Sequence, residues 1–246
     1  MKFKRFNYET VTSTNDFAKE LLQTTDCVIV TANYQTRGRG RNENSWFGDF
    51  GQNVYFSLGI RHNEMKRAED LAHLQGLGCL AVLATLRQLC PHLDFRLKYP
   101  NDVYVRAEGG KFKKISGILI EHQFVGEFCY ATILGIGINV NQMTFPNDVE
   151  EFATSLKILG CKLMVDVVVD KLIDNIQNFF SLLPWEVLQK WFEELNIIGK
   201  KIFVVNRNYF CEAVALDNIG RLVVRNQDRG ETLVITDGDS IRYEIE

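Results

Sequence analysis

The sequence predicts an α+β fold. Segments with strand patterns and segments with helical patterns follow one another in irregular order, without the strand–helix alternation of a doubly wound parallel sheet. The C-terminal part differs, because it holds five short strand patterns separated by Asn, Asp and Gly turns. We therefore expect a mixed sheet with packed helices over residues 1–196. A small β-barrel of the SH3 or OB size class is expected over residues 197–246.

The individual elements follow from local patterns. Ser13 or Thr14 can serve as the N-cap of a first helix, over residues 13–23. Residues 27–33 and 53–60 have the pattern of buried strands, joined by a long loop. Two glycines inside the next helix, over residues 68–90, indicate close packing against another element. The remaining expected elements are strands at 95–100, 102–106, 114–124 and 128–140, helices at 167–183 and 184–195, and strands at 200–206, 209–217, 220–226, 231–238 and 240–246.

Composition excludes several classes of protein. With 246 residues, 46% of them hydrophobic, and a net charge of −3, the chain lacks the basic excess of a general nucleic-acid or membrane-surface binder. Any anion site must therefore be local. The N-terminus has no apolar signal region, and no stretch reaches the length of a membrane span. Six scattered cysteines, mostly in apolar runs, are expected to be reduced core residues of a cytoplasmic protein.

Positive charge is concentrated in the loop QTRGRGRNENSW, from Gln35 to Trp46. Glycines allow backbone N–H groups to curl around an anion, and arginines donate in pairs to carboxylate or phosphate oxygens. A solvated basic loop and a nucleic-acid segment of the RGG type are the alternatives. Three arginines separated only by glycine repel one another, which favours a small anionic ligand.

Two lysines lie beside further polar motifs. In KYPND, Lys98 could hold a phosphate and Asp102 could bind a metal or orient an amine, although Pro-Asn-Asp is also ordinary turn chemistry. In KISGILIE, Lys114 enters an apolar strand, so its side chain either extends to solvent or points into a pocket.

Glycine motifs give weaker signals. Neither GLGCLA nor GIGINVN completes a dinucleotide-binding fingerprint, and no P-loop is present. In GIGINVN the paired glycines would let a ligand approach the backbone, and Asn139 could contact a polar edge such as that of adenine. The four histidines are isolated, and no nucleophile–base arrangement is evident. The chemistry indicated is electrostatic, as in phosphoryl or nucleotidyl transfer with Mg²⁺.

Several motifs in order resemble those of one family. TSTND at a helix start, YQTRGRGRNENSW, KYPND, KISGILIE, GIGINVN and ATSL together resemble the biotin protein ligases, also called biotin–[acetyl-CoA-carboxylase] ligases. The five-strand tail is similar to the SH3-like C-terminal domain of that family. The resemblance implies a catalytic domain like that of the class II aminoacyl-tRNA synthetases, with a mixed, largely antiparallel sheet.

The resemblance also implies an activity in two steps. The carboxylate of biotin attacks ATP to give biotinyl-5′-AMP, and a lysine of a biotin carboxyl carrier domain then attacks that anhydride. Biotin and ATP would be substrates, Mg²⁺ would accompany ATP, and no nucleic acid or membrane would be bound. An exposed edge strand of the catalytic sheet would suit a homodimer or the docking of the carrier. A lipoate protein ligase, or a biotin- or nucleotide-binding protein without catalysis, is the alternative.

Matching motif positions imply roles for individual residues. Lys114 is expected to be the main electrostatic catalyst, together with Arg39 and Asp102. The residues expected to contact biotin are Ser13, Thr14, Asn15, Gln35, Arg39, Gly40, Arg41 and Lys114. Those expected near the nucleotide are Trp46, Lys98, Asn101 and Asn139, and no protein metal ligand is assigned.

The chain departs from the family pattern at two positions. Tyr99 stands where tryptophan is usual, and Glu43 where glycine is frequent, so Glu43 could stiffen the loop or pair with an arginine. The segment before TSTND is too short for a helix-turn-helix, so the repressor function of bifunctional members is not expected.

Overall fold

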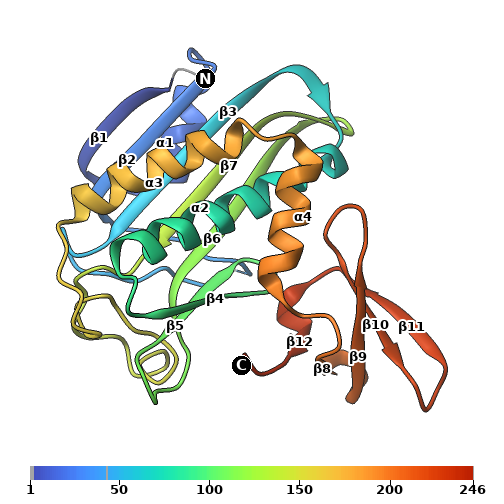
Figure 1. Ribbon diagram of the computed structural model, residues 1–246. Helices are drawn as coiled ribbons and strands as arrows, with labels where there is room; N and C mark the ends of the chain where they lie inside the picture. The colour runs from blue at the N-terminus through green and yellow to red at the C-terminus, as the bar shows by residue number, and fades with distance from the viewer. Residues whose placement is uncertain (1–2, 43, 246) are drawn as a thin grey trace.

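A computed structural model describes residues 3–42 and 44–245 (Figure 1). The expectation for Glu43 falls outside these residues. The α+β class is confirmed: a 7-stranded mixed sheet carries the helices, and a 5-stranded sheet forms the C-terminal part. The exact division at residues 196 and 197 stays a prediction.

The large sheet has the strand order β1-β2-β3-β7-β6-β5-β4. Only β1 and β2 pair in parallel, and every other described neighbour pair is antiparallel. The strands are β1 (Lys4–Val11), β2 (Cys27–Gln35), β3 (Val54–Lys66), β4 (Asp94–Lys98), β5 (Asp102–Arg106), β6 (Lys113–Val125) and β7 (Phe128–Ile138). Sequence reasoning missed β1, because an edge strand exposed over most of its length has no apolar run.

Helices cover the two faces of this sheet unequally. In Figure 1, α2 and α3 lie across the near face, and α1 lies on the far side. The helices are α1 (Thr14–Leu21), α2 (His73–Leu89), α3 (Val165–Phe180) and α4 (Pro184–Leu195). The helix expected over 68–90 is divided, because Ala68–Leu71 forms a 3-10 turn before α2. Its glycines do permit close packing: a Cβ at Gly76 would lie 3.0 Å from Trp191, and one at Gly78 would lie 2.9 Å from Leu134.

The second sheet is antiparallel, with the order β11-β10-β9-β8-β12. Its strands are β8 (Lys201–Val204), β9 (Tyr209–Leu216), β10 (Leu222–Asn226), β11 (Glu231–Ile235) and β12 (Ile241–Arg242). All five expected strands are present, but the barrel is not closed within the described residues. Strand β12 is only two residues long and pairs with β8, so β11 and β12 remain the edges of the sheet.

One hydrophobic cluster joins both sheets. It includes Leu83 of α2, Trp191 of α4, and Leu222 and Ile241 of the second sheet. A smaller cluster packs α1 against the opposite face of the large sheet through Ala18 and other residues. The large core therefore lies on the α2 and α3 side, which leaves the α1 side free to form a polar pocket.

The expectation that all six cysteines are reduced is wrong. Cys90, at the end of α2, forms a disulfide with Cys161, 71 residues later. Both segments pack on the core, and burial in an apolar run does not distinguish a paired from an unpaired cysteine. Cys27, Cys79, Cys129 and Cys211 are buried, as expected.

Candidate active site

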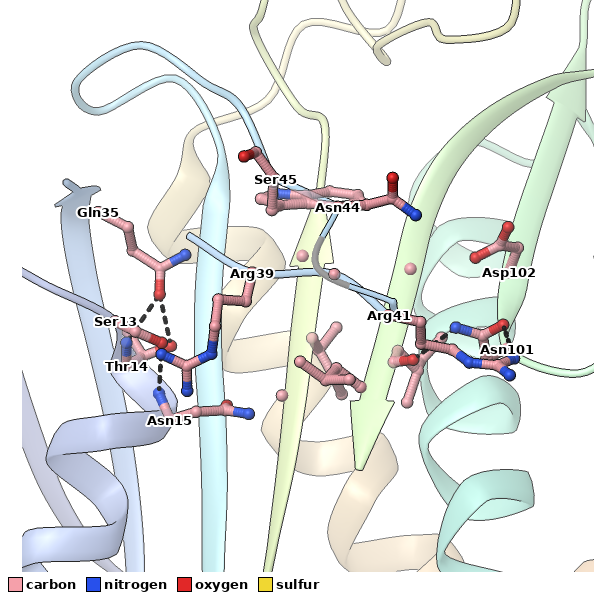
Figure 2. Close-up of a pocket in the computed structure, with 18 of the residues that line it drawn as sticks. Ser13, Thr14, Asn15, Gln35, Arg39, Arg41, Asn44, Ser45, Asn101 and Asp102 are labelled. Atoms are coloured by element: carbon pink, nitrogen blue, oxygen red, sulfur yellow. Dashed lines mark hydrogen bonds between the residues drawn. The ribbon is translucent and has the colours of Figure 1, made fainter. Parts of the chain in front are cut away.

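The candidate site is a pocket on the α1 face of the large sheet (Figure 2). Its floor is the backbone of β6 and β7 at Gly117, Gly135 and Gly137, where the absence of Cβ atoms leaves room above the strands. In Figure 2, the side chains that follow β1 and β2 gather at one end, and Arg41, Asn101 and Asp102 lie at the other. The lining residues are Ser13, Thr14, Asn15, Gln35, Arg39, Gly40, Arg41, Asn44, Ser45, Trp46, Phe56, Asn101, Asp102, Lys114, Gly117, Ile118, Leu119, Gly135, Ile136, Gly137 and Asp239.

A buried polar network forms the first end of the pocket. Ser13 is the N-cap of α1 and accepts a hydrogen bond from the backbone N–H of Asn15, so the helix begins at this wall. Gln35 at the end of β2 accepts from the Thr14 backbone N–H at 2.7 Å. Ser57 of β3 donates to Thr14 Oγ1 at 2.7 Å and lies 2.5 Å from Asn15 Oδ1. These neutral donors and acceptors can recognise an uncharged polar group.

Carboxylates surround Arg39 at the same end. Its guanidinium donates to both oxygens of Asp16, at 2.7 and 2.8 Å, and reaches Glu121 Oε1 at 3.3 Å. The hydrogen bond from Arg39 lowers the pKa of Asp16, and the bond to Asp16 raises the pKa of Arg39. Glu121 Oε2 also accepts from Asn15 Nδ2 at 2.5 Å. Arg39 is therefore already paired with protein carboxylates in this arrangement, instead of presenting a free cation to the pocket.

The other end of the pocket holds two cationic side chains. Lys114 Nζ lies 2.7 Å from Asp102 Oδ1, an ion pair that lacks hydrogen-bond alignment. The strand register brings these two side chains together. Asp102, at the start of β5, pairs with Gly117 of β6, and Lys114 lies three residues before Gly117 on the same strand. Arg41 Nη1 donates to Asn101 Oδ1 at 3.2 Å, and Arg41 Nη2 lies 2.8 Å from Asp237 Oδ1 in the turn between β11 and β12. Both cations are paired with a carboxylate, and their other N–H groups can donate to anionic oxygens of a ligand.

Trp46 covers the glycine floor between the two ends. A Cβ at Gly137 would lie 2.3 Å from the Trp46 ring, and one at Gly117 would lie 3.1 Å from it, so the ring rests directly on these strands. Lys114 Nζ is 5.8 Å from the ring centroid, and the buried Trp46 Nε1 has no hydrogen-bond partner. A flat aromatic surface beside a lysine is suited to a planar or anionic ligand.

Two of the predicted residues do not line the pocket. Asn139 is buried, and its Nδ2 donates to the Thr154 carbonyl at 3.0 Å, so it joins β7 to the ATSL segment. Lys98 Nζ lies 3.4 Å from the Tyr104 hydroxyl, and burial lowers the pKa of Lys98. The structure brings together Ser13, Thr14, Asn15, Gln35, Arg39, Gly40, Arg41, Trp46, Asn101, Asp102 and Lys114.

Sequence reasoning missed other residues that line the pocket or contact its lining side chains. Glu121 and Ser57 were inside segments already interpreted as strands, and nothing local marked their side chains as facing polar partners. Asp239 lies in the second sheet region, about 200 residues from the loop that it meets, so no sequence spacing could reveal it. Among the residues that the structure describes, no cluster of three or more His, Cys, Asp or Glu side chains could hold a metal ion.

Comparison with known proteins identifies relatives. The sequence model of the biotin/lipoate A/B protein ligase family matches residues 8–139. The bifunctional ligase/repressor BirA of Bacillus spizizenii is 32% identical over 235 residues, which are 89% of this chain and 69% of that protein. The biotin–[acetyl-CoA-carboxylase] ligase of Mycobacterium tuberculosis is 36% identical over 139 residues, 55% of this chain and 47% of that protein.

A solved structure has a similar fold over the whole chain. The biotin protein ligase from Aquifex aeolicus in complex with biotin and ATP superposes with a TM-score of 0.73 and 26% identity, covering 98% of this chain and 99% of that chain. The matched residues include helix α1 with its cap and the glycines of β7, which lie at the pocket. The chain therefore belongs to the biotin/lipoate A/B protein ligase family.

Proposed function

We propose that this chain is an ATP-dependent biotin protein ligase. The observation that carries the proposal is one pocket with a neutral polar network at one end and cations at the other, separated by a glycine floor. Relatives named as biotin ligases, and the Aquifex complex with biotin and ATP, support the same reading. A neutral ureido ring fits the network, and a carboxylate that meets a phosphate fits the cationic end.

The first step joins biotin to the nucleotide. A biotin carboxylate oxygen bonds to the α-phosphorus of ATP, the bond to the bridging oxygen breaks, and pyrophosphate leaves with that electron pair. Lys114 and Arg41 stabilise the negative charge that develops on the phosphate oxygens. The product is biotinyl-5′-AMP, with Ser13, Thr14, Asn15 and Gln35 holding the head group and Gly40 and Arg39 belonging to the loop above it.

The second step transfers biotin to a protein lysine. The unprotonated amine of a biotin carboxyl carrier domain bonds to the acyl carbon, the bond to the phosphate oxygen breaks, AMP leaves with that electron pair, and the amine nitrogen releases one proton to water. Asp102 lies in the pocket beside Lys114 and can orient the incoming amine. Mg²⁺ would accompany ATP and neutralise its phosphates. Trp46 and Asn101 belong to the nucleotide side, whereas Lys98 and Asn139 would act there only by supporting the fold.

Location and assembly belong to the same proposal. Within the described residues, no helix combines the length and apolar character needed to cross a bilayer. We assign the enzyme to the cytoplasm, where biotin carriers and ATP are available. A homodimer through an edge of the large sheet, β1 or β4, stays a prediction.

Mass spectrometry of a carrier domain tests the proposal. The domain, incubated with this protein, biotin and Mg·ATP, should gain one biotinyl group on a single lysine. Replacing biotin by lipoate tests the alternative that the chain is a lipoate protein ligase. The absence of any adenylate or pyrophosphate with biotin would leave only a binding protein and would overturn the proposal.

A further inference from the structure

A carboxylate beside the pocket contacts two of the side chains that the proposed function uses. Glu121 lies on β6, two residues beyond Leu119 and four beyond Gly117, so by strand alternation it faces the same side of the sheet as these two pocket residues. Glu121 Oε2 accepts from Asn15 Nδ2 at 2.5 Å, and Arg39 Nη2 lies 3.3 Å from Glu121 Oε1 and 3.4 Å from Oε2. Glu121 therefore lies between two donors.

The side chain of Asn15 packs on the glycine floor of the pocket. The residue is 5% exposed, and a Cβ at Gly135 would lie 2.4 Å from its Oδ1 and 3.0 Å from its Nδ2, so the amide lies directly over β7. Ser57 Oγ approaches Oδ1 to 2.5 Å. An asparagine in this place can present either its oxygen or its NH2 group to a ligand, because the two ends of the amide have nearly the same shape. Its hydrogen-bond partners decide between them.

The carboxylate of Glu121 selects one of the two orientations. A carboxylate has acceptors on both oxygens and no donor, so the NH2 group of Asn15 faces it and Asn15 Oδ1 points away, toward Ser57 and the floor. A glutamine at position 121 could not serve both of its partners. If its oxygen accepted from Arg39, its NH2 group would face the NH2 group of Asn15, and the Asn15 amide would have to reverse. The opposite placement would set two donors against each other at Arg39.

We propose that Glu121 is a positioning residue that fixes the amide orientation of Asn15, so that Asn15 Oδ1 accepts from an N–H of the ureido ring of biotin. The inference rests on the proposed function and adds to it a residue that does not line the pocket. A ureido ring carries two N–H donors, so a reversed Asn15 amide would set a donor against a donor. Loss of this one match weakens biotin binding about tenfold.

Two variants provide a matched comparison. Glu121→Gln keeps the size of the side chain and replaces one of its two acceptors by a donor. Glu127→Gln makes the same change on the exposed turn between β6 and β7 and is the control. Calorimetry should show biotin affinity about tenfold weaker in Glu121→Gln, and within about twofold of wild type in Glu127→Gln. Wild-type affinity in Glu121→Gln overturns the inference.

Steady-state kinetics separates this role from general damage to the site. In pyrophosphate release, the KM for biotin should rise about tenfold in Glu121→Gln, while kcat and the KM for ATP change by less than about twofold. A lower kcat, or an equal rise in the KM for ATP, would mean that the whole site is disturbed and would overturn the inference.

A double-mutant cycle tests whether Glu121 acts through Asn15 or through Arg39. Asn15→Ala alone should weaken biotin binding. Adding Glu121→Gln to it should change the affinity by less than about twofold, because no amide remains to be positioned. A further tenfold loss in the double variant would assign the effect to Arg39 and would overturn the inference.

An NMR measurement without ligand tests the contact itself. The signals of the Asn15 side-chain NH2 group, identified by their loss in Asn15→Ala, should move in Glu121→Gln and stay in place in Glu127→Gln. Unmoved signals in Glu121→Gln overturn the inference even where biotin binds. If the wild type binds no biotin, the proposed ligase function fails, whereas the positioning of Asn15 by Glu121 stands or falls with these signals alone.

Discussion

Arg39 and Arg41 look equivalent in the sequence but differ in their surroundings. Arg39 is paired with Asp16 and Glu121, so these three side chains carry a net negative charge beside the polar network at the first end of the pocket. Arg41 faces Asn101 and a single carboxylate at the cationic end. Arg41 and Lys114 therefore lie at the end of the pocket where we propose that the phosphate binds, and Arg39 contacts Glu121, which accepts from Asn15.

Lys114 should be the most sensitive position for chemistry. Lys114→Ala removes the cation beside Asp102 and should lower adenylate formation about 10²- to 10³-fold, the range seen when one electrostatic stabiliser is lost. Pyrophosphate release with biotin and Mg·ATP measures this rate. The matched control is Lys113→Ala, whose Nζ donates to the Glu150 carbonyl at 3.2 Å, outside the pocket. A wild-type rate in Lys114→Ala would remove Lys114 from the mechanism.

Histidines should make stability depend on pH. His62 and His122 both hydrogen-bond Thr132, and burial lowers the pKa of each below its usual value near 6.5. As pH falls through about 6.5, the unfolded chain binds protons that the folded chain does not, so the free energy of unfolding decreases. The slope is at most about 1.4 kcal/mol per pH unit for each histidine.

Urea unfolding at pH 7.5, 6.5 and 5.5 measures this slope. His122→Gln should reduce it by the contribution of one histidine, and His92→Gln, at an exposed position, is the matched control. A free energy of unfolding that does not decrease between pH 7.5 and 5.5 would contradict the lowered pKa values of His62 and His122.

Close packing of side chains against β7 explains why this strand carries two glycines. A Cβ at Gly135 would lie 2.4 Å from Asn15 Oδ1, which Ser57 Oγ approaches to 2.5 Å. Gly135→Ala should therefore displace Asn15 and weaken biotin binding at least tenfold, measured by calorimetry. Gly110→Ala, in the loop between β5 and β6, adds the same methyl group 3.2 Å from a carbonyl and outside the pocket. Equal biotin affinity in Gly135→Ala and wild type would mean that Asn15 does not contact biotin.

Local patterns predicted most elements but not their limits. Capping at Ser13 depends on neighbouring residues, so it could be recognised from sequence and was confirmed. The paired glycines of GIGINVN line the pocket, and the close approach of a ligand to them stays a prediction. Strand β3 continues six residues beyond the expected end at Ile60, where an exposed polar pattern carries no signal. Strand β1 was missed for the same reason, because only its neighbour β2 makes it a strand.

At the scale of the whole molecule, Trp191 joins the two sheets. It is 2% exposed, packs on Gly76 of α2, and a Cβ at Gly220 of the second sheet region would lie 2.6 Å from it. Trp191→Ala should lower the free energy of unfolding by about 3–5 kcal/mol. Trp185→Ala on the same helix, where the side chain is 61% exposed, should change it by less than about 0.5 kcal/mol.

Chemical denaturation followed by circular dichroism measures both variants. Because one hydrophobic cluster continues through both sheets, a single transition is expected for the wild type. Similar decreases in the free energy of unfolding for the two variants, or two separate unfolding transitions in the wild type, would contradict the role of Trp191 as the link between the sheets.

The sequence by itself determined the α+β class, most elements and most of the side chains that line the pocket. The class and the elements depend on caps, turns and periodicities within a few residues, whereas the pocket side chains were expected because their motifs resemble those of a known family. Tertiary structure alone decided that Arg39 pairs with Asp16 and Glu121, that Arg41 reaches Asp237, that Cys90 meets Cys161, and that the second sheet stays open. Each of these contacts joins distant segments, and packing of the two sheets around one core brings them together.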